Sequence, residues 1–501
     1  MLAGEVLRLT ANRIPAKTAL ICGERRIDYA ALDMAADRFA GALINRNIAP
    51  GDRVAIMSRN SIEYCIAHFG CARAGAVIVN LMPAYASAEL EAIIGATEAK
   101  LVFADPECAA KMLSVAEFLG CLDSVIELAT LDDFLATGDG ISLPTGLSPT
   151  EPLGMTFTGG TTGLPKGAVV SHACRYVSSW TTAIEHAVRE EDTVGVLTPL
   201  YHAMGSMVWM PTAVMLGATA VLMPEWDPDA FIETTAAHGI STVLMVPLQL
   251  QQILRGDHFD ADKLRCLTNI ACGGAITPEG LVHEVAGKMP WARFTNHYGQ
   301  SETGPICVYK PHHPREKADT IGMPAIGVDL KIVDEDGNEA ATGEPGEIIV
   351  RGPFLMKGYF DNAAETGLYF RNGDGWGWTG DLAARDADGF IRLIGRSKDM
   401  IVSGGINIYP REIELTLEAH DAIADCTVFG VPDEKWGEAL VAYVVCRAGA
   451  TLTEKDVIGW CEEKLARFKT PKHVRILNAI PKTPAGKVQK PKLRDAFLAG
   501  N

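Results

Sequence analysis

A stretch rich in glycine and threonine, residues 158–167, has the composition of a loop that binds phosphates. It follows the apolar run 153–157 and reads Thr-Gly-Gly-Thr-Thr-Gly-Leu-Pro-Lys-Gly. Glycines let backbone N–H groups approach anionic oxygens, hydroxyls add donors, and Lys166 adds a positive charge. It is not a P-loop of the GxxxxGK[ST] type, because Pro165 replaces the second glycine and Gly167 follows the lysine. A plain surface turn rarely has this composition, so we predict that polyphosphate is bound by Thr158, Gly159, Gly160, Thr161, Thr162, Gly163 and Lys166.

Two carboxylates further along the chain have the chemistry of metal and nucleotide ligands. Glu302 lies in Asn-His-Tyr-Gly-Gln-Ser-Glu-Thr-Gly at 296–304, and Mg²⁺ prefers hard oxygen ligands of this kind. Asp381 ends the stretch Trp-Thr-Gly-Asp, and one carboxylate can accept two hydrogen bonds from a vicinal diol. Taken alone, Glu302 could instead be a solvated loop carboxylate and Asp381 a turn former.

Five more stretches contain glycine: 199–205, 271–276, 395–401, 403–414 and 481–490, and all but 271–276 also contain histidine, lysine or arginine. On their own, the histidine of the first would be a core residue and the lysines of the last would be solvated charges. Their order along the chain carries more information than any one of them.

Together, the phosphate loop and these stretches resemble the adenylate-forming superfamily, which includes acyl- and aryl-CoA synthetases, peptide-synthetase adenylation domains and beetle luciferases. Within it the chain resembles the AMP-forming acid–CoA ligases, although Gly159 stands where the family usually has serine. The resemblance implies that a carboxylic acid and ATP give an acyl-adenylate and pyrophosphate, after which CoA takes the acyl group and AMP leaves. ATP, Mg²⁺ and the co-substrate CoA are therefore expected.

The resemblance also implies roles for individual residues. Catalysis is expected from Lys487, Glu302, His202 and Thr161, with Glu302 and Thr161 also holding the metal. Besides the phosphate loop, contacts with ATP or AMP are expected from Gly274, Ala275, Asn296, His297, Tyr298, Gly299, Ser301, Asp381 and Arg396. Lys398 is expected to be the hinge, and CoA is expected to contact Gly404, Gly405 and Trp436. The expected acyl pocket consists of Tyr201, His202, Met204, Trp209, Gly274 and Ile306. Lys482 and Lys490, beside Lys487, are expected to be solvated.

The acid is less well defined by the sequence. His202 stands where amino-acid-activating domains usually carry aspartate, so an amino acid is not expected. None of the other expected pocket residues is Arg or Lys, which disfavours a dicarboxylate and leaves a medium-chain fatty or aromatic monocarboxylate. The main alternative is a stand-alone adenylation enzyme that loads a carrier protein; a regulatory nucleotide-binding protein that has lost its chemistry is a further one.

Bulk properties limit the partners. A formal net charge of −17 over 501 residues argues against nucleic acid or an anionic membrane as partner. The twelve cysteines are scattered without a C-x-x-C pair, so reduced thiols and a cytoplasmic location are expected. The apolar region 194–223 is broken by proline and glycine, so no transmembrane segment is predicted. The sequence does not define the oligomeric state, for which a homodimer is the commonest default.

Short apolar runs alternate with amphipathic stretches, which predicts an α/β fold with largely parallel sheets. Strands are expected at 53–57, 77–81, 101–103, 219–223 and 242–246, and helices at 63–73, 87–97 and 231–238. Tight turns between 321 and 350 indicate antiparallel β-structure, followed by a hairpin at 381–394. The predicted domains are a large N-terminal adenylation domain at 1–395, a hinge at 396–400 and a small mobile α/β domain at 401–501.

Overall fold

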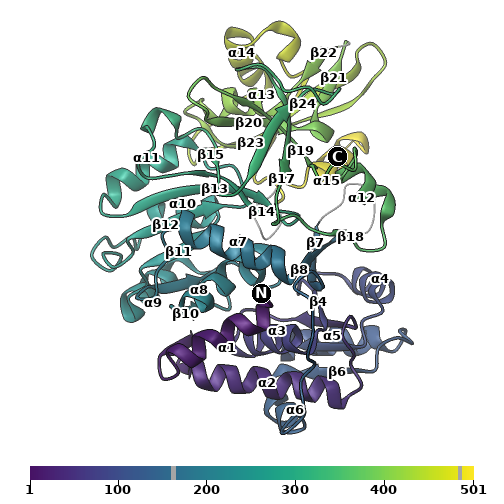
Figure 1. Cartoon of the computed structure of the whole chain (residues 1–501). Helices are drawn as coiled ribbons and strands as arrows, with labels where there is room; N and C mark the ends of the chain where they lie inside the picture. Colours follow the sequence, from purple (N-terminus) through teal and green to yellow (C-terminus); the bar gives the residue numbers. More distant parts are fainter. Residues whose placement is uncertain (159–164, 405, 483–487, 501) are drawn as a thin grey trace. The chain divides into compact units, whose positions relative to one another are not determined.

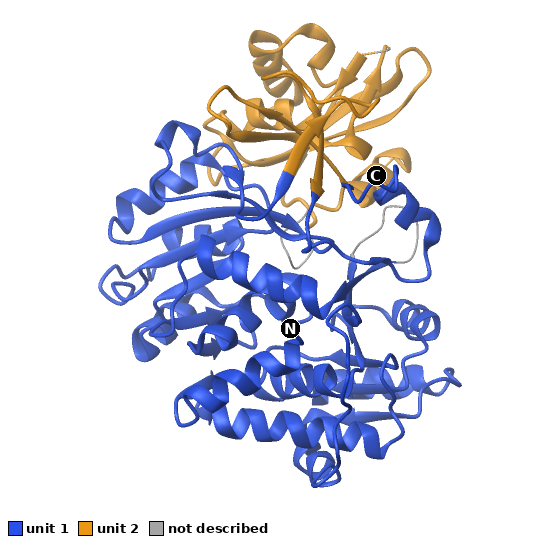
Figure 2. Cartoon of the chain, in the orientation of Figure 1, with its two compact units in different colours: residues 1–329, 351–377 blue, residues 330–350, 378–501 orange. Residues whose placement is uncertain are grey.

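The computed structural model describes residues 1–158, 165–404, 406–482 and 488–500. They form two compact units (Figure 2): residues 1–329 with 351–377, and residues 330–350 with 378–501. Among the described residues, no helix is both long and apolar enough to cross a membrane. The predicted hinge at 396–400 and the motion about it stay predictions.

Unit 1 contains a seven-stranded sheet (Figure 1). Its order is β18-β8-β7-β4-β3-β5-β6, in which the pairs from β7 to β6 are parallel and the pairs that β8 makes are antiparallel. The strands are β3 (Arg53–Met57), β4 (Val77–Asn80), β5 (Leu101–Ala104), β6 (Ser124–Glu127), β7 (Pro152–Thr158), β8 (Lys166–Ser171) and β18 (Gly358–Tyr359). Every residue of β4 and β5 is buried, as expected for parallel strands covered on both faces.

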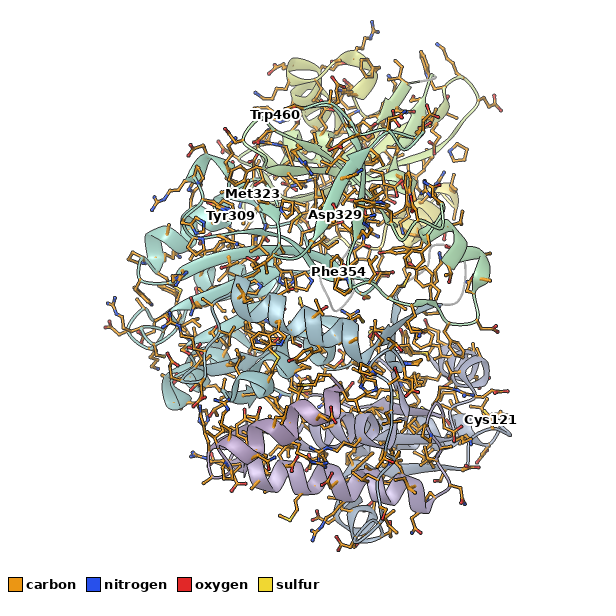
Figure 3. All side chains as sticks on the ribbon, viewed as in Figure 1. Cys121, Tyr309, Met323, Asp329, Phe354 and Trp460 are labelled. Atoms are coloured by element: carbon orange, nitrogen blue, oxygen red, sulfur yellow. The ribbon has the colours of Figure 1, made fainter. Side chains whose placement is uncertain are left out.

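The second sheet of unit 1 has nine strands in the order β15-β14-β13-β12-β11-β9-β10-β1-β2. It is parallel from β13 to β1 and antiparallel at both edges. The strands are β1 (Thr18–Cys22), β2 (Arg25–Asp28), β9 (Thr193–Val196), β10 (Thr219–Leu222), β11 (Thr242–Met245), β12 (Asn269–Gly273), β13 (Arg293–Gln300), β14 (Gly304–Tyr309) and β15 (Met323–Pro324). At one edge, Tyr309 and Met323 lie close together (Figure 3).

Helices cover these sheets, and some of them begin at a side-chain cap. The side chain of Ser61 caps α3 and that of Ser171 caps α7, and α3 ends at Gly75 with a positive φ of 74°. The helices are α1 (Ala3–Arg13), α2 (Tyr29–Asn45), α3 (Ile62–Ala74), α4 (Ser87–Thr97), α5 (Pro106–Ala116), α6 (Leu131–Ala136), α7 (His172–Glu185), α8 (Met210–Leu216), α9 (Pro228–His238), α10 (Pro247–Arg255), α11 (Glu279–Lys288) and α12 (Ala363–Tyr369).

The described residues of unit 2 form two smaller sheets and three α-helices. One sheet has the order β16-β17-β19-β20, with β16 (Asp329–Val333), β17 (Gly346–Arg351), β19 (Gly377–Arg385) and β20 (Ile391–Arg396). The other contains β21 (Ile401–Ser403), β22 (Ile406–Ile408), β23 (Ile423–Asp433), β24 (Gly437–Cys446) and β25 (His473–Leu477). Its helices are α13 (Pro410–Glu418), α14 (Glu454–Lys464) and α15 (Lys490–Leu498).

The predicted α/β class, with largely parallel sheets and a β-rich portion, is confirmed. The helix predicted at 87–97 has those bounds, and the predicted strands differ by one residue at most from the observed ones. The hairpin predicted at 381–394 is formed by β19 and β20.

Candidate active site

The phosphate loop connects two paired strands of the seven-stranded sheet. Thr158, the last residue of β7, is paired with Lys166, the first residue of β8. The two ends of the predicted loop are therefore held together by the sheet. Gly159, Gly160, Thr161, Thr162 and Gly163, with their predicted roles, lie outside the described residues.

Lys166 contacts two residues that the sequence did not single out. Its Nζ lies 2.6 Å from Oε2 of Glu365 on α12, and 5.8 Å from the centre of the Tyr359 ring on β18. The Lys166 side chain is about one quarter exposed, so its charge can meet a ligand from solvent. Residues far along the chain are thus brought to the edge of β8.

Glu302 lies in the turn between β13 and β14 and is buried. Its Oε1 accepts a hydrogen bond of 2.8 Å from the hydroxyl of Tyr359, and its backbone carbonyl accepts one of 2.7 Å from the N–H of Met356. Both donors come from the segment around β18, so one segment holds the backbone and the side chain of Glu302. Tyr359 also joins Glu302 to Lys166.

The carboxylate of Glu302 fits the role of a Mg²⁺ ligand. It is a hard oxygen donor whose position is fixed by Tyr359. No cluster of three or more acidic, histidine or cysteine side chains that could hold a metal is present among the described residues. A magnesium ion that arrives with nucleotide takes most of its ligands from phosphates and water, so one or two protein oxygens suffice.

Asn296 and His297, predicted to contact nucleotide, have their side chains occupied within the core. Oδ1 of Asn296 accepts a hydrogen bond of 2.9 Å from the hydroxyl of Thr277, and Nδ1 of His297 lies 3.3 Å from Nε2 of His186. Burial lowers the pKa of His297 to about 4, so its ring is neutral at pH 7. Contact of these two residues with nucleotide stays a prediction, as it does for Tyr298, Gly299, Ser301 and Ala275.

Only some of the residues predicted to form the acyl pocket are neighbours in the structure. The rings of Tyr201 and His202 lie 4.9 Å apart, just before a π-helix at Met204–Trp209. Gly274 has a φ of 80°, and a Cβ there would lie 3.5 Å from Cε of Met204, so these two residues are neighbours. A π-helix is rare and is often found at functional sites.

Two other predicted pocket residues, Trp209 and Ile306, are fully buried. The indole N–H of Trp209 donates to the carbonyl of Gly195 over 3.0 Å, so the side chain is part of the core packing.

In unit 2, the predicted ribose ligands Asp381 and Arg396 are brought together. They face each other across β19 and β20, and Nε of Arg396 lies 2.9 Å from Oδ1 of Asp381. Asp381 is buried, whereas the Arg396 side chain is nearly half exposed. Lys398, the predicted hinge, follows in a short 3₁₀-helix.

The predicted CoA-binding residues Gly404 and Trp436 are also neighbours. The N–H of Gly404 donates to the carbonyl of Trp436 over 2.7 Å, and a Cβ at Gly404 would lie 3.1 Å from the indole ring. Trp436 is 41% exposed. Gly405 and Lys487 lie outside the described residues.

The expectation that Lys482 and Lys490 are solvated is wrong. Nζ of Lys482 lies 2.6 Å from Asp425, and Nζ of Lys490 lies 3.0 Å from Glu414 and also donates to the Val428 carbonyl. Buried or half-buried carboxylates on neighbouring elements attract both lysines. Lys482 and Val488 also pair through their backbones in an antiparallel bridge.

Sequence reasoning missed Tyr359, Glu365 and Arg175. Only Arg175 had a detectable signal in the sequence. It falls on the same face of the helix 172–185 as Cys174, Ser178 and Ser179, and this face is buried. Tyr359 and Glu365 follow no pattern of their own and become part of the site through tertiary contacts.

The comparisons with known proteins identify the family of the chain. Residues 7–360 match the family model described as AMP-binding enzyme, and residues 412–487 match the AMP-binding enzyme C-terminal domain. The chain therefore belongs to the AMP-binding enzymes, the adenylate-forming acyl-CoA synthetase family.

Individual relatives span nearly the whole chain. The chain is 34% identical to an indoleacetate–CoA ligase of Aromatoleum aromaticum, over 96% of this chain and 95% of the relative. It is 32% identical to a feruloyl-CoA synthase of Amycolatopsis sp, over 97% of each. The structure of ATP-bound MatB from Rhodopseudomonas palustris superposes with a TM-score of 0.92 at 28% identity, covering 99% of both chains.

Proposed function

We propose that this enzyme joins an aromatic or medium-chain monocarboxylic acid to CoA with cleavage of ATP to AMP. The observation that carries the proposal is the arrangement of Lys166, Tyr359 and Glu302, which gathers a cation and a fixed carboxylate beside the phosphate loop. The names of the relatives, which refer to indoleacetate and feruloyl groups, favour an aromatic acid. The neighbours Met204 and Gly274 would offer it an apolar surface.

In the first step, a carboxylate oxygen of the acid attacks the α-phosphorus of ATP. The new P–O bond forms as the bond to pyrophosphate breaks, and an acyl-adenylate results. Both reactants are anions, so the barrier is largely electrostatic. Lys166 and Lys487, with the N–H groups and hydroxyls of the phosphate loop, neutralise the charge that moves onto pyrophosphate.

Glu302 and Thr161 would hold Mg²⁺, which when bound supplies positive charge to the phosphates. The Asp381 carboxylate accepts hydrogen bonds from the ribose hydroxyls, and Arg396 orients these hydroxyls. His202 borders the acid's carboxylate, and Tyr298 covers the adenine. These roles extend the resemblance to the positions described above.

In the second step, the CoA thiolate attacks the acyl carbon, and the bond to AMP breaks. The mixed anhydride is already activated, so the protein mainly orients the thiol and excludes water. Gly404, Gly405 and Trp436 would admit the pantetheine arm after a rotation about Lys398. A cytoplasmic location and a homodimer complete the proposal, and sedimentation analysis tests the latter.

The test is pyrophosphate release from ATP and Mg²⁺ over a panel of short, medium, long and aromatic acids, each with and without CoA. Turnover that requires CoA and is fastest with aromatic or medium-chain acids supports the proposal. Pyrophosphate release with no thioester formed would point instead to a carrier protein as acceptor. Fastest turnover with a dicarboxylate would overturn the proposed acid.

A further inference from the structure

Arg175 is a buried cation behind the turn that carries Glu302. It lies in the first turn of α7 and is only 2% exposed. Its Nη2 donates a hydrogen bond to the backbone carbonyl of Ser301. Within the described part of the chain, its Nε and Nη1 are buried without a hydrogen-bond partner. A buried guanidinium with two unpartnered nitrogens is costly, so a compensating charge is expected near it.

The nearby carboxylate is that of Glu302. Burial lowers the pKa of Arg175, and neighbouring groups, among them the carboxylate of Glu302, oppose this change. The negative charge of Glu302 therefore favours the charged form of Arg175, although the two side chains form no direct ion pair.

The packing of the turn against α7 explains how Arg175 comes so close. Gly304 has a φ of 74°, and a Cβ there would lie 2.7 Å from Oγ of Ser178 and 3.2 Å from Nη1 of Arg175. Only glycine allows this approach. The turn is thus held on one side by α7 and on the other by Met356 and Tyr359.

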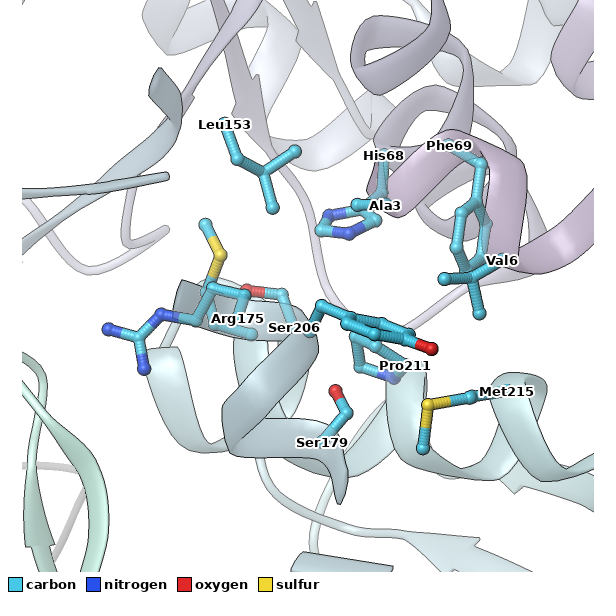
Figure 4. Close-up of a pocket in the computed structure, with 12 residues that line it drawn as sticks. Ala3, Val6, His68, Phe69, Leu153, Arg175, Ser179, Ser206, Pro211 and Met215 are labelled. Carbon is cyan, nitrogen blue, oxygen red and sulfur yellow. The ribbon is translucent and has the colours of Figure 1, made fainter. Parts of the chain in front are cut away.

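Arg175 also lines a small cavity between α1, α3, α7 and α8 (Figure 4). Its guanidinium points away from the ring of His68, which lines the same cavity. The cavity has a volume of about 20 Å³, enough for one water molecule and far too small for an acid or nucleotide. Arg175 is therefore placed to act on the Ser301–Glu302 turn, and this cavity is no substrate site.

We propose that Arg175 is a positioning residue for Glu302: it holds the Ser301 carbonyl, and with it the turn that carries Glu302, so that nucleotide with Mg²⁺ meets a fixed carboxylate. This inference rests on the proposed role of Glu302. Partners that position a metal ligand typically contribute 10- to 100-fold to metal affinity or activity, and an effect of about that size is expected here.

The test is a double-mutant cycle on nucleotide binding. The dissociation constant of ATP with Mg²⁺ is measured by calorimetry for the wild type, Arg175→Gln, Glu302→Gln and the double variant. Gln keeps a donor and much of the side-chain length at position 175, and Arg175→Met is the second variant if Arg175→Gln does not fold. We expect each single change to weaken binding about 10-fold or more, and the second change to add little to the first.

The matched control is Arg73→Met. Arg73 is also buried and donates to a backbone carbonyl, that of Gly4, but it pairs with Asp33 and Asp37 on another helix. Its loss should lower the melting temperature and leave the ATP dissociation constant unchanged. Independent, additive effects of the Arg175 and Glu302 changes, or no effect of Arg175→Gln, would overturn the positioning role of Arg175 and leave the role of Glu302 intact. No effect of Glu302→Gln would overturn the role of Glu302 as well.

Discussion

The hydroxyl of Tyr359 donates a hydrogen bond of 2.8 Å to Oε1 of Glu302, across 57 positions of sequence. This single contact joins the segment around β18 to the turn between β13 and β14. The Tyr359 ring also faces Lys166. One tyrosine thus relates the proposed metal ligand to the lysine of the phosphate loop.

Tyr359→Phe should lower kcat/KM for ATP about 10-fold, because a hydrogen bond to a carboxylate is worth roughly 1.5–3 kcal/mol. The measurement is pyrophosphate release at varied ATP. The control is Tyr29→Phe, because the hydroxyl of Tyr29 donates a buried hydrogen bond of 2.6 Å to the Ala218 carbonyl and belongs to the core packing. Equal kinetics for Tyr359→Phe and the wild type would show that Glu302 does not depend on Tyr359.

Glu365→Gln should lower KM for ATP about two- to five-fold, the effect of removing a partly exposed ion pair. Glu365 holds Lys166 at 2.6 Å, so phosphates must compete with this carboxylate for the lysine. Glu233→Gln, which breaks an ion pair with Lys263 elsewhere in unit 1, should leave KM unchanged. A raised KM for Glu365→Gln would mean that the pair supports the site rather than competing with ATP.

Lys487→Ala should reduce acyl-adenylate formation about 10²–10³-fold, the usual loss for one preorganised charged group. The same variant should convert supplied acyl-adenylate and CoA to thioester at nearly the wild-type rate. Single-turnover assays of each half-reaction measure the two effects. Lys492→Ala, an exposed lysine on α15, is the control. Similar losses in both half-reactions would contradict the division of labour.

Lowering the pH from 6.5 to 4 should reduce the free energy of unfolding. Burial, with a smaller contribution from His172, lowers the pKa of His68 to about 4. Between these values the unfolded chain binds a proton that the folded chain does not, so acid favours unfolding by roughly 1.4 kcal/mol per pH unit.

Denaturant titrations at several pH values test this dependence. His68→Asn should show a shallower loss of stability between pH 6.5 and 4 than the wild type. At exposed His258, Asp229 raises the pKa, so this group favours the folded state in acid and His258→Asn should not make the loss shallower. An unchanged slope in His68→Asn would contradict the buried neutral state of that ring.

The sequence predicted elements whose signals are local. Helix α4 and strand β3 have the predicted bounds because their apolar residues recur with the period of their own structure. Lys166 and Glu302 could be selected because each stands in a glycine-rich motif. Tyr359 and Arg175 could not be assigned a role, since their importance comes from hydrogen bonds to Glu302 and to the Ser301 carbonyl that only the tertiary fold forms. The pairing of Lys490 with Glu414 was missed for the same reason.

The close fit between α7 and the turn at Gly304 has a consequence for building chimeras with related enzymes. Residues 152–185 form a single segment that supplies both flanks of the phosphate loop and Arg175. A crossover between positions 186 and 295 would take this segment from one parent and the 300–304 turn from the other. Any residue other than glycine at position 304 would then meet Ser178 at 2.7 Å. The two segments must fit each other, so functional chimeras should take both from the same parent.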